Sequence, residues 1–518
     1  MREDNEVRVS SDLSEGEIKA TQNRRERVKT CLHELLDVHF EEDNVPNIVV
    51  LGSGGGLRAM IALLGTLVEL KNQNILDAVM YLCGVSGSTC YNSPYLQVND
   101  DEESRKVTTS QENVENFWVP YYSEEPYVVS AVIPNILRLG GYDAIQNDLD
   151  RLDRCMSMLY TDWKWSEKLS LEENLIKILT VDSWDFWKAI DYLEESSEDE
   201  NYSLTDVWAC VVYTILHQFD EKELTDYKNA SESGINPYPI YAAVDKEKLS
   251  EAGASSPGTW FEFTPHEAGY TALGAFVSTE NFGSKFEKGT LMEKNKKKTI
   301  CYMQGLWGSA LGSMEEILKA ILAGLWSIFR ILTKTTKCTL KWRWGTTNNF
   351  LYKCPNIQSS HLFENKTISL IDAGLAINSA YPLVLKKQRQ TDLILSFDFS
   401  SGDPFETVKK AADYCQKNDI PFPKIEKQKM DKESPSDCYV FRGDKSCPTV
   451  IHFPLFNKVN CSDKIEEYRS KFCTRNMSYS ETNIKDLLAK AKLNVSNNSK
   501  KILQEIQLLL SSSHTNKF

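Results

Sequence analysis

Two glycine-rich turns lie close together in this sequence, and both contain residues that could take part in acyl transfer. Residues 52–58 read Gly-Ser-Gly-Gly-Gly-Leu-Arg, and residues 84–88 read Gly-Val-Ser-Gly-Ser. A serine hydroxyl attacks a carbonyl group well only when a sharp turn presents it beside a base, with N–H donors facing the developing oxyanion. The second turn could present Ser86 in this way, and the triple glycine of the first could expose N–H groups to an oxyanion or a phosphate. An ordinary strand-to-helix turn and a flexible glycine loop are the alternatives.

The residues around the two turns predict the elements that would position them. An apolar run precedes each turn, over residues 47–51 and 78–83, with the length and the β-branched or aromatic content of a buried parallel strand. Residues 57–71 between them read as a helix. In such a βαβ unit both turns leave the carboxyl edge of the sheet and can converge on one ligand. A nucleotide site fits less well, because Leu57 stands where the third glycine of a dinucleotide-binding loop would be.

The base and the residue that would bind a phosphate are left open by local spacing. The chain order Ser86, Asp372, His452 matches that of some hydrolase triads, but His452 lies in an apolar run, where a histidine is more often a hydrogen-bonded core residue. A carboxylate bonded directly to Ser86 could also act as the base, and Asp372 closes a predicted strand. Arg58 could grip a phosphate, or it could be a surface arginine or pair with an acid.

The composition excludes several classes of function. The 518 residues carry a net charge of −14, so a broad attraction to nucleic acid is not expected. The first residues are highly charged and do not resemble a secretory signal, and no stretch approaches the length of a membrane span, so we expect a cytosolic protein. The 13 cysteines lack metal-binding spacing, which predicts reduced thiols and no metal or cofactor site.

Seven motifs along the chain match those of a known enzyme family in the same order. They are GSGGGLRAM (52–60), GVSGST (84–89), TPHEAG (264–269), FGSKF (282–286), GLWGSA (305–310), IDAGL (371–375) and LSFDFS (395–400). On these motifs the chain resembles the cytosolic (group IV) phospholipase A2 family over about residues 46–460. The resemblance implies a patatin-like α/β fold, with a central, mostly parallel sheet, flanking helices and a lid or cap insertion.

The resemblance also implies roles for particular residues. Ser86 would be acylated and Asp372 would act as its base, as a Ser–Asp dyad. Gly55 and Gly56 would supply the oxyanion N–H groups, and Arg58 would bind the phosphate of the substrate. His452 would then be structural.

The activity implied by the resemblance is hydrolysis of the sn-2 acyl ester of glycerophospholipids, with lysophospholipase and acyl-transfer activity. The partners would be membrane phospholipids and lysophospholipids, reached by peripheral contact with intracellular membranes from the cytoplasm. Two alternatives are a weakly active or inactive lipid-binding protein on the same fold and a Ser-His-Asp esterase.

The spacing of apolar residues and the resemblance together predict the organisation of the chain. Residues 1–45 are expected to form a helical leader, and residues 46–518 a single catalytic domain with a C-terminal helix. The cap or lid insertions would fall at roughly 91–260 and 313–345. The C-terminal helix fits residues 484–510, with an interruption at Asn494–Asn498.

Three segments bear on calcium and on membrane attachment. Because the core begins near residue 46, we expect no calcium-binding C2 domain before it, and hence calcium-independent activity. The last four residues, Thr515–Phe518, contain no cysteine for a prenyl group, in contrast to one family member. The apolar segment Ile317–Leu332 is too short and too charged to span a bilayer, and is either a core or lid helix or an interfacial helix.

Overall fold

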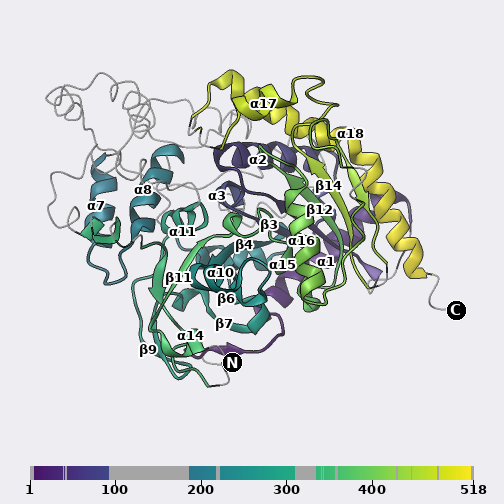
Figure 1. Cartoon of the computed structure of the whole chain (residues 1–518). Helices are drawn as coiled ribbons and strands as arrows, with labels where there is room; N and C mark the ends of the chain where they lie inside the picture. Colours follow the sequence, from purple (N-terminus) through teal and green to yellow (C-terminus); the bar gives the residue numbers. More distant parts are fainter. Residues whose placement is uncertain are drawn as a thin grey trace, which may run out of the picture.

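The computed structural model in Figure 1 describes most of the chain outside two long segments. The described residues are 5–92, 186–309 and 334–514, without residues 39, 41–43, 217–221, 336, 340, 342, 356, 358–359, 427–429, 445, 475 and 477. The segment Ile317–Leu332 and most of both predicted insertions therefore lie outside the described residues.

The centre of the fold is a sheet in which five neighbouring strands run parallel. In spatial order they are β4 (Tyr238–Asp245), β3 (Tyr81–Gly84), β2 (Asn47–Gly52), β12 (Thr391–Asp398) and β14 (Thr449–Pro454). Their apolar runs are buried on both faces, as expected for parallel strands covered by helices. The predicted α/β class with a mostly parallel central sheet is confirmed.

Antiparallel strands extend this sheet at both ends. At one edge β13 (Tyr439–Phe441) pairs with β14; at the other, the order from β4 outward is β5 (Trp260–Phe263), β6 (Glu267–Tyr270), β7 (Ala275–Ser278) and β1 (Arg8–Val9). Two more strands, β11 (Thr367–Asp372) and β10 (Thr346–Asn348), continue from β4, and β8 (Lys285–Glu287) pairs with β9 (Thr290–Glu293).

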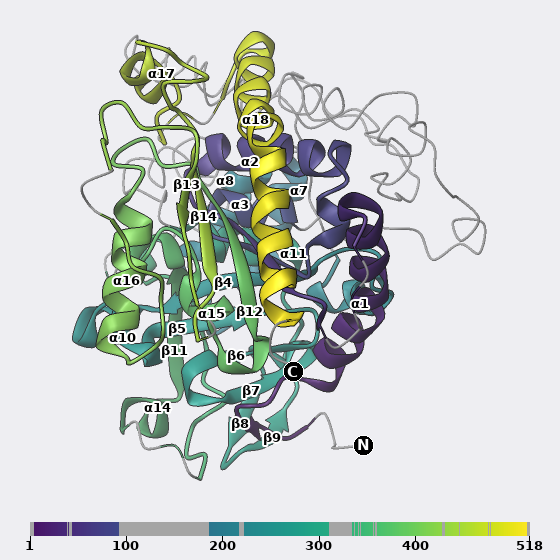
Figure 2. The same ribbon diagram turned by 90° about the vertical axis from the view of Figure 1, so that its right-hand side faces the viewer.

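Helices cover both faces of the parallel section, which Figure 2 shows nearly edge-on. On one side lie α1 (Glu15–Leu36), α2 (Gly56–Asn72) and α18 (Glu481–His514), and on the other α15 (Tyr381–Val384) and α16 (Glu406–Lys417). Between the sheet and α18, α2 is buried on nearly all sides. The two helices cross so closely at Gly65 that a Cβ atom there would lie 2.9 Å from the carbonyl oxygen of Leu488.

The remaining helices of the described residues are short. They are α3 (Gly87–Asn92), α7 (Phe186–Ser196), α8 (Leu204–Leu216), α9 (Lys228–Glu232), α10 (Lys246–Ala252), α11 (Ile300–Trp307), α14 (Ser360–Glu364) and α17 (Ile465–Lys471). No described helix has both the length and the apolar character needed to cross a bilayer.

Two predictions about the organisation of the chain are wrong in detail. The insertion predicted over roughly 91–260 extends too far, because β4 begins at Tyr238 and lies between β3 and β5 in the sheet. The expected interruption of the last helix at residues 494–498 is absent, since α18 is continuous over this stretch. The buried amide of Asn494 donates to the carbonyl oxygen of Pro454 at 2.9 Å and accepts from Asn457 at 2.8 Å, so it does not compete for the helix backbone.

The first helix is tied to the sheet by a buried cation. Arg24 of α1 is 1% exposed, and its guanidinium donates to backbone carbonyl oxygens of the segments that precede β3 and β4. Those acceptors are Leu76 (3.0 Å), Val79 (2.5 Å), Gly234 (3.0 Å) and Ile235 (2.7 Å). Residues 1–45, predicted as a helical leader, thus contain a helix that is hydrogen-bonded to the rest of the fold through a buried arginine.

Candidate active site

Ser86 lies on a strained turn between β3 and α3. It is a non-glycine residue with a φ of 53°, in the left-handed region that non-glycine residues adopt at a cost of roughly 1–3 kcal/mol. Such strain is common where a nucleophile is presented on a sharp strand-to-helix turn. The next residue, Gly87, packs against the first turn, since a Cβ atom on it would lie 2.0 Å from the carbonyl oxygen of Gly56.

The first glycine turn leads into the start of a helix, where a cradle of N–H groups can form. Gly55 is the N-cap of α2 with a φ of 157°, and Gly56 begins the helix with a φ of 61°. At the start of a helix the N–H groups have no carbonyl one turn earlier to bond with, so they can serve an anion. Because Gly56 contacts Gly87, this cradle lies beside the turn that carries Ser86.

Two serines hold the turns in place. Ser53 Oγ accepts from the Phe399 N–H at 2.7 Å, which links the first turn to the end of β12. Ser88 Oγ donates to the Ser53 carbonyl oxygen at 2.7 Å, which links the two turns to each other. This bond accounts for a serine at position 88, where many strand-to-helix nucleophile turns have glycine.

Strand pairing brings Asp372 to the same place. In β4, Tyr241 pairs with Gly84 at the end of β3, and Ala243 pairs with Asp372 at the end of β11. Because β11 runs antiparallel to β4, the carboxyl ends of β3 and β11 point toward each other, about 7 Å apart along β4. Asp372 is 0% exposed.

One hydrogen bond orients the Asp372 carboxylate, and another holds the backbone of Asp372. Its Oδ1 accepts from the Gly374 N–H at 2.7 Å, and its own N–H donates to Ser309 Oγ at 3.0 Å. A Cβ atom on Gly374 would lie 3.0 Å from Asp372 Oδ1 and 3.7 Å from a methyl group of Val85, the residue before Ser86. The carboxylate therefore adjoins the serine turn, as a direct Ser–Asp arrangement requires.

Arg58 is buried beside the cradle and bonded to protein acceptors. It is 1% exposed, and burial lowers the pKa of its guanidinium. Its Nε donates to the Phe399 carbonyl oxygen at 2.6 Å, Nη1 to the Phe472 carbonyl oxygen, and Nη2 to Thr474 Oγ1 at 3.0 Å. A guanidinium has five N–H groups, and these bonds use three of them. The other two would have to bind the substrate phosphate. Phosphate binding by Arg58 stays a prediction.

The comparisons with known proteins agree with this geometry. Residues 48–151 and 145–403 match the family model of the lysophospholipase catalytic domain. Cytosolic phospholipase A2 gamma of Homo sapiens is 34% identical over 97% of this chain and 96% of its own length. The chain belongs to the cytosolic phospholipase A2 family. Its Mus musculus gamma relative is 32% identical over 96% of this chain and 91% of its own.

A solved structure shows the same fold. Human GIVD cytosolic phospholipase A2 superposes with a TM-score of 0.71 at 24% identity, covering 99% of this chain and 69% of that one. The resemblance inferred from the sequence motifs is thus confirmed, and the family assignment identifies a phospholipase A2 hydrolase.

His452 of this phospholipase A2 family member does not contact Ser86. It pairs with Ser396 of β12, which lies level with Leu51 of β2 and Cys83 of β3, so about 14 Å separates it from β3. Its Nε2–H donates to the Pro404 carbonyl oxygen at 2.7 Å, its Nδ1 accepts from Ser396 Oγ at 3.1 Å, and burial lowers its pKa. The histidine is a satisfied core residue, and a triad through it is excluded.

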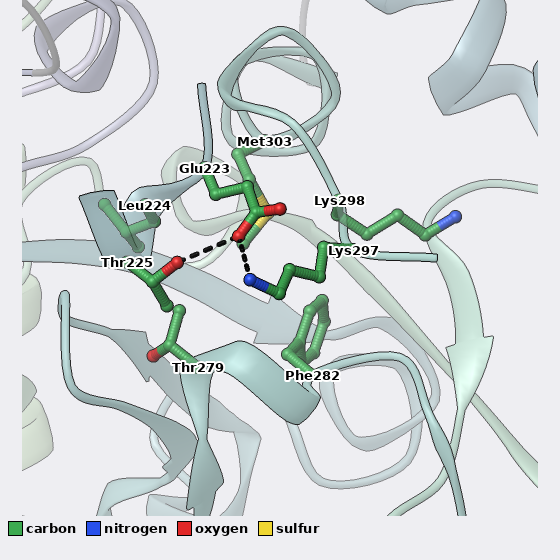
Figure 3. Close-up of a pocket in the computed structure, with 8 residues that line it drawn as sticks. All are labelled: Glu223, Leu224, Thr225, Thr279, Phe282, Lys297, Lys298 and Met303. Atoms are coloured by element: carbon green, nitrogen blue, oxygen red, sulfur yellow. Dashed lines mark hydrogen bonds and ion pairs between the residues drawn. The ribbon is translucent and has the colours of Figure 1, made fainter. Parts of the chain in front are cut away.

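A separate pocket lies away from these residues (Figure 3). Its walls are Glu223, Leu224, Thr225, Thr279, Phe282, Lys297, Lys298 and Met303. Glu223 pairs with Lys297 at 2.6 Å and accepts from Thr225 at 3.0 Å, so these polar groups already bond one another. Within the described residues, no group of three or more histidine, cysteine or acidic side chains could hold a metal ion.

The sequence assigns no role to two residues of the site. Ser309 lies in one of the family motifs, but its contact with Asp372 joins residues 63 positions apart. Asn378, which bonds to Gly54, belongs to none of the motifs, and its type and position predict only a loop. Both become visible only through long-range contacts in the fold.

Proposed function

We propose that this phospholipase A2 family member hydrolyses the sn-2 ester of glycerophospholipids through a dyad of Ser86 and Asp372. One observation carries the proposal: β3 and β11 end facing each other along β4, with Ser86 on a strained turn and a buried carboxylate beside it. A serine with an adjacent base and nearby N–H donors is the arrangement that acyl transfer needs.

The proposed reaction has two steps. Asp372 takes the proton of Ser86 Oγ as the oxygen attacks the ester carbon, and the N–H groups of Gly55 and Gly56 stabilise the oxyanion. The carbon–oxygen bond to the lysophospholipid breaks, and Asp372 returns the proton to that alcohol, which leaves an acyl-Ser86. Water then repeats the sequence and releases the fatty acid, and a second lipid alcohol in its place would give acyl transfer.

We further propose activity without calcium, lysophospholipase activity, and a cytoplasmic enzyme that contacts membranes peripherally. Each step above uses a side chain or backbone group of this chain, and the match to a lysophospholipase catalytic domain supports the second substrate class. The matched relatives are named cytosolic phospholipases A2, which supports the cytoplasmic location.

Release of labelled fatty acid tests this function. Phosphatidylcholine vesicles labelled in the sn-2 chain are incubated with the wild type or with Ser86→Ala in a calcium chelator. We expect labelled fatty acid from the wild type and only the blank level from the variant, and the same contrast with lysophosphatidylcholine. Equal release by both proteins would contradict the role of Ser86. Release by the wild type only after calcium is added would contradict calcium independence.

Arg58→Lys tests the proposed phosphate contact. Lysine keeps the charge but cannot reproduce the planar fork of donors. If Arg58 binds the substrate phosphate, kcat/KM for phosphatidylcholine should fall about 10–100-fold, in line with the loss of a charge-assisted hydrogen bond. Hydrolysis of a short acyl ester that lacks phosphate should change little.

The neutral ester serves as the control in that experiment, because it needs the same cradle and dyad. An equal loss on both substrates would contradict phosphate binding and would leave Arg58 as a residue that only joins α2 to residues 399, 472 and 474. Circular dichroism of Arg58→Lys checks that the fold is retained.

A further inference from the structure

We propose that Asn378 is a positioning residue, which holds the oxyanion turn (Gly54–Gly56) at a fixed place relative to Ser86 and Asp372. This inference rests on the proposed dyad of Ser86 and Asp372. Asn378 lies in the loop that follows β11 and does not need to touch the substrate to act in this way.

Asn378 forms hydrogen bonds with both backbone polar groups of Gly54. The backbone carbonyl oxygen of Asn378 accepts from the Gly54 N–H at 3.0 Å, a bond that a substitution at 378 can keep, and its side-chain Nδ2 donates to the Gly54 carbonyl oxygen at 3.0 Å. The same Nδ2 donates to Ser400 Oγ at 3.2 Å, so the loop after β12 is joined to the contact. Because Gly55 and Gly56 follow directly, the position of Gly54 determines where their N–H groups point.

The orientation of this amide is determined by its partners. The Gly54 carbonyl oxygen can only accept, so the NH2 group must face it and Oδ1 must face the other way. A Cβ atom on Gly54 would lie 2.4 Å from Asn378 Oδ1 and 2.8 Å from Ser86 Cβ. The amide oxygen and the Ser86 side chain therefore border the same small space above Gly54, which leaves room only for glycine.

Asn378 also belongs to the segment that carries the base. The backbone N–H groups of Ala376 and Ile377 both donate to the Ala373 carbonyl oxygen, at 3.0 and 3.2 Å, which makes the stretch after Asp372 a compact turn. A Cβ atom on Gly374 would lie 3.0 Å from both Asn378 Oδ1 and Asp372 Oδ1. One side chain thus joins the turn that would stabilise the oxyanion to the segment that would accept the proton.

Loosening this contact should slow the chemical step. Loss of one oxyanion donor costs about 10²–10³ in kcat, and a displacement of about 1 Å can cost about 10². We therefore expect Asn378→Ala and Asn378→Asp each to lower kcat about 100-fold, with KM within about threefold of the wild type. The aspartate variant is nearly isosteric, but it replaces the NH2 donor with an acceptor that faces the Gly54 carbonyl oxygen.

The matched control is Ser400→Ala, which removes one partner of Nδ2 and leaves both bonds to Gly54 intact. It should keep kcat within about threefold of the wild type. Each variant is also treated with a long-chain alkyl fluorophosphonate, which the serine attacks at phosphorus with loss of fluoride. The rate of this labelling should fall in Asn378→Ala and Asn378→Asp by about the same factor as kcat, while the urea midpoint stays close to that of the wild type.

Ser86→Ala, assayed in parallel, separates failure of this inference from failure of the proposed function. A wild-type kcat in folded Asn378→Ala and Asn378→Asp, with Ser86→Ala inactive, would overturn the role of Asn378 alone. A change confined to KM would also overturn it, because a positioning residue for the oxyanion turn acts on the chemical step. Wild-type turnover by Ser86→Ala would instead overturn the proposed dyad.

Discussion

Asp372→Asn is expected to lower kcat for phospholipid hydrolysis by about 10⁴-fold, because an amide cannot take the proton of the serine. This is the size of loss seen when one member of a catalytic serine constellation is removed. Ser86→Ala should lose a similar factor, and the double variant should lose no more than the larger of the two, because the residues act as a unit. Initial rates of fatty-acid release from sn-2-labelled phosphatidylcholine measure all three.

A second buried aspartate provides the control for Asp372→Asn. Asp206 in α8 is 3% exposed, and burial raises its pKa to about 6. Its carboxylate accepts from the Ser203 N–H at 2.8 Å, a bond that asparagine can also accept. Asp206→Asn should therefore retain near-normal turnover. A folded Asp372→Asn variant that kept more than about a tenth of the wild-type rate would show that another group is the base.

Arg389→Met is expected to destabilise the fold by about 3–5 kcal/mol, the cost of removing one partner from a buried ion pair. Arg389 is fully buried between Glu17 of α1 and Glu262 of β5, at 2.9 and 2.8 Å. Its loss leaves two carboxylates in the interior without their cation. Urea unfolding at neutral pH, followed by fluorescence, measures the change. The result also tests whether α1 is an integral part of the catalytic fold.

Acidification should lower the stability of the wild type but raise that of Arg389→Met. In the wild type burial alone would raise the pKa of Glu262, but the Arg389 charge outweighs it and holds that pKa below its usual value of 4.5. The pair therefore contributes stability above about pH 4.5 and loses it as the pH falls further. In Arg389→Met, burial without the cation favours protonated Glu262, so acidification should recover part of the lost stability.

Arg442→Met is the matched control for the buried arginine. Arg442 forms an ion pair with Glu505 at 2.7 Å; its own side chain is 65% exposed, whereas that of Glu505 is 6% exposed. Because this cation lies largely in solvent and its removal leaves one carboxylate unpaired instead of two, the variant should lose clearly less stability than Arg389→Met. Similar losses in the two arginine variants would contradict a special contribution of the buried network.

The parts of this fold that could be predicted are those encoded locally. The strand–turn–helix–strand unit from residue 47 to 84 is visible because apolar runs, glycines and helical spacing follow one another within a few dozen residues. The two glycine turns converge because parallel strands bring their carboxyl ends to one edge. The sequence alone therefore indicated a nucleophile turn facing an N–H cradle.

The partners of those turns depend on the tertiary structure. Asp372 and His452 both lie in apolar, strand-like runs, and local propensity does not distinguish them as a base for Ser86. Their difference lies in which strands pair: β11 ends against β3 along β4, whereas β14 lies beyond β2 and β12. Pairing between distant segments follows from the packing of the whole sheet, because each contact is specified by both segments together.

The same reason explains the residues whose environment was missed or misjudged. The Arg58 guanidinium donates to carbonyl groups of residues 399 and 472. Asn494 lies within a continuous helix because its amide bonds with buried partners in another loop. Residue type and spacing cannot supply such partners. The sequence by itself determined two glycine turns side by side at one edge of the sheet, and the tertiary structure decided which distant side chains lie beside them, because only folding brings their polar groups within bonding distance.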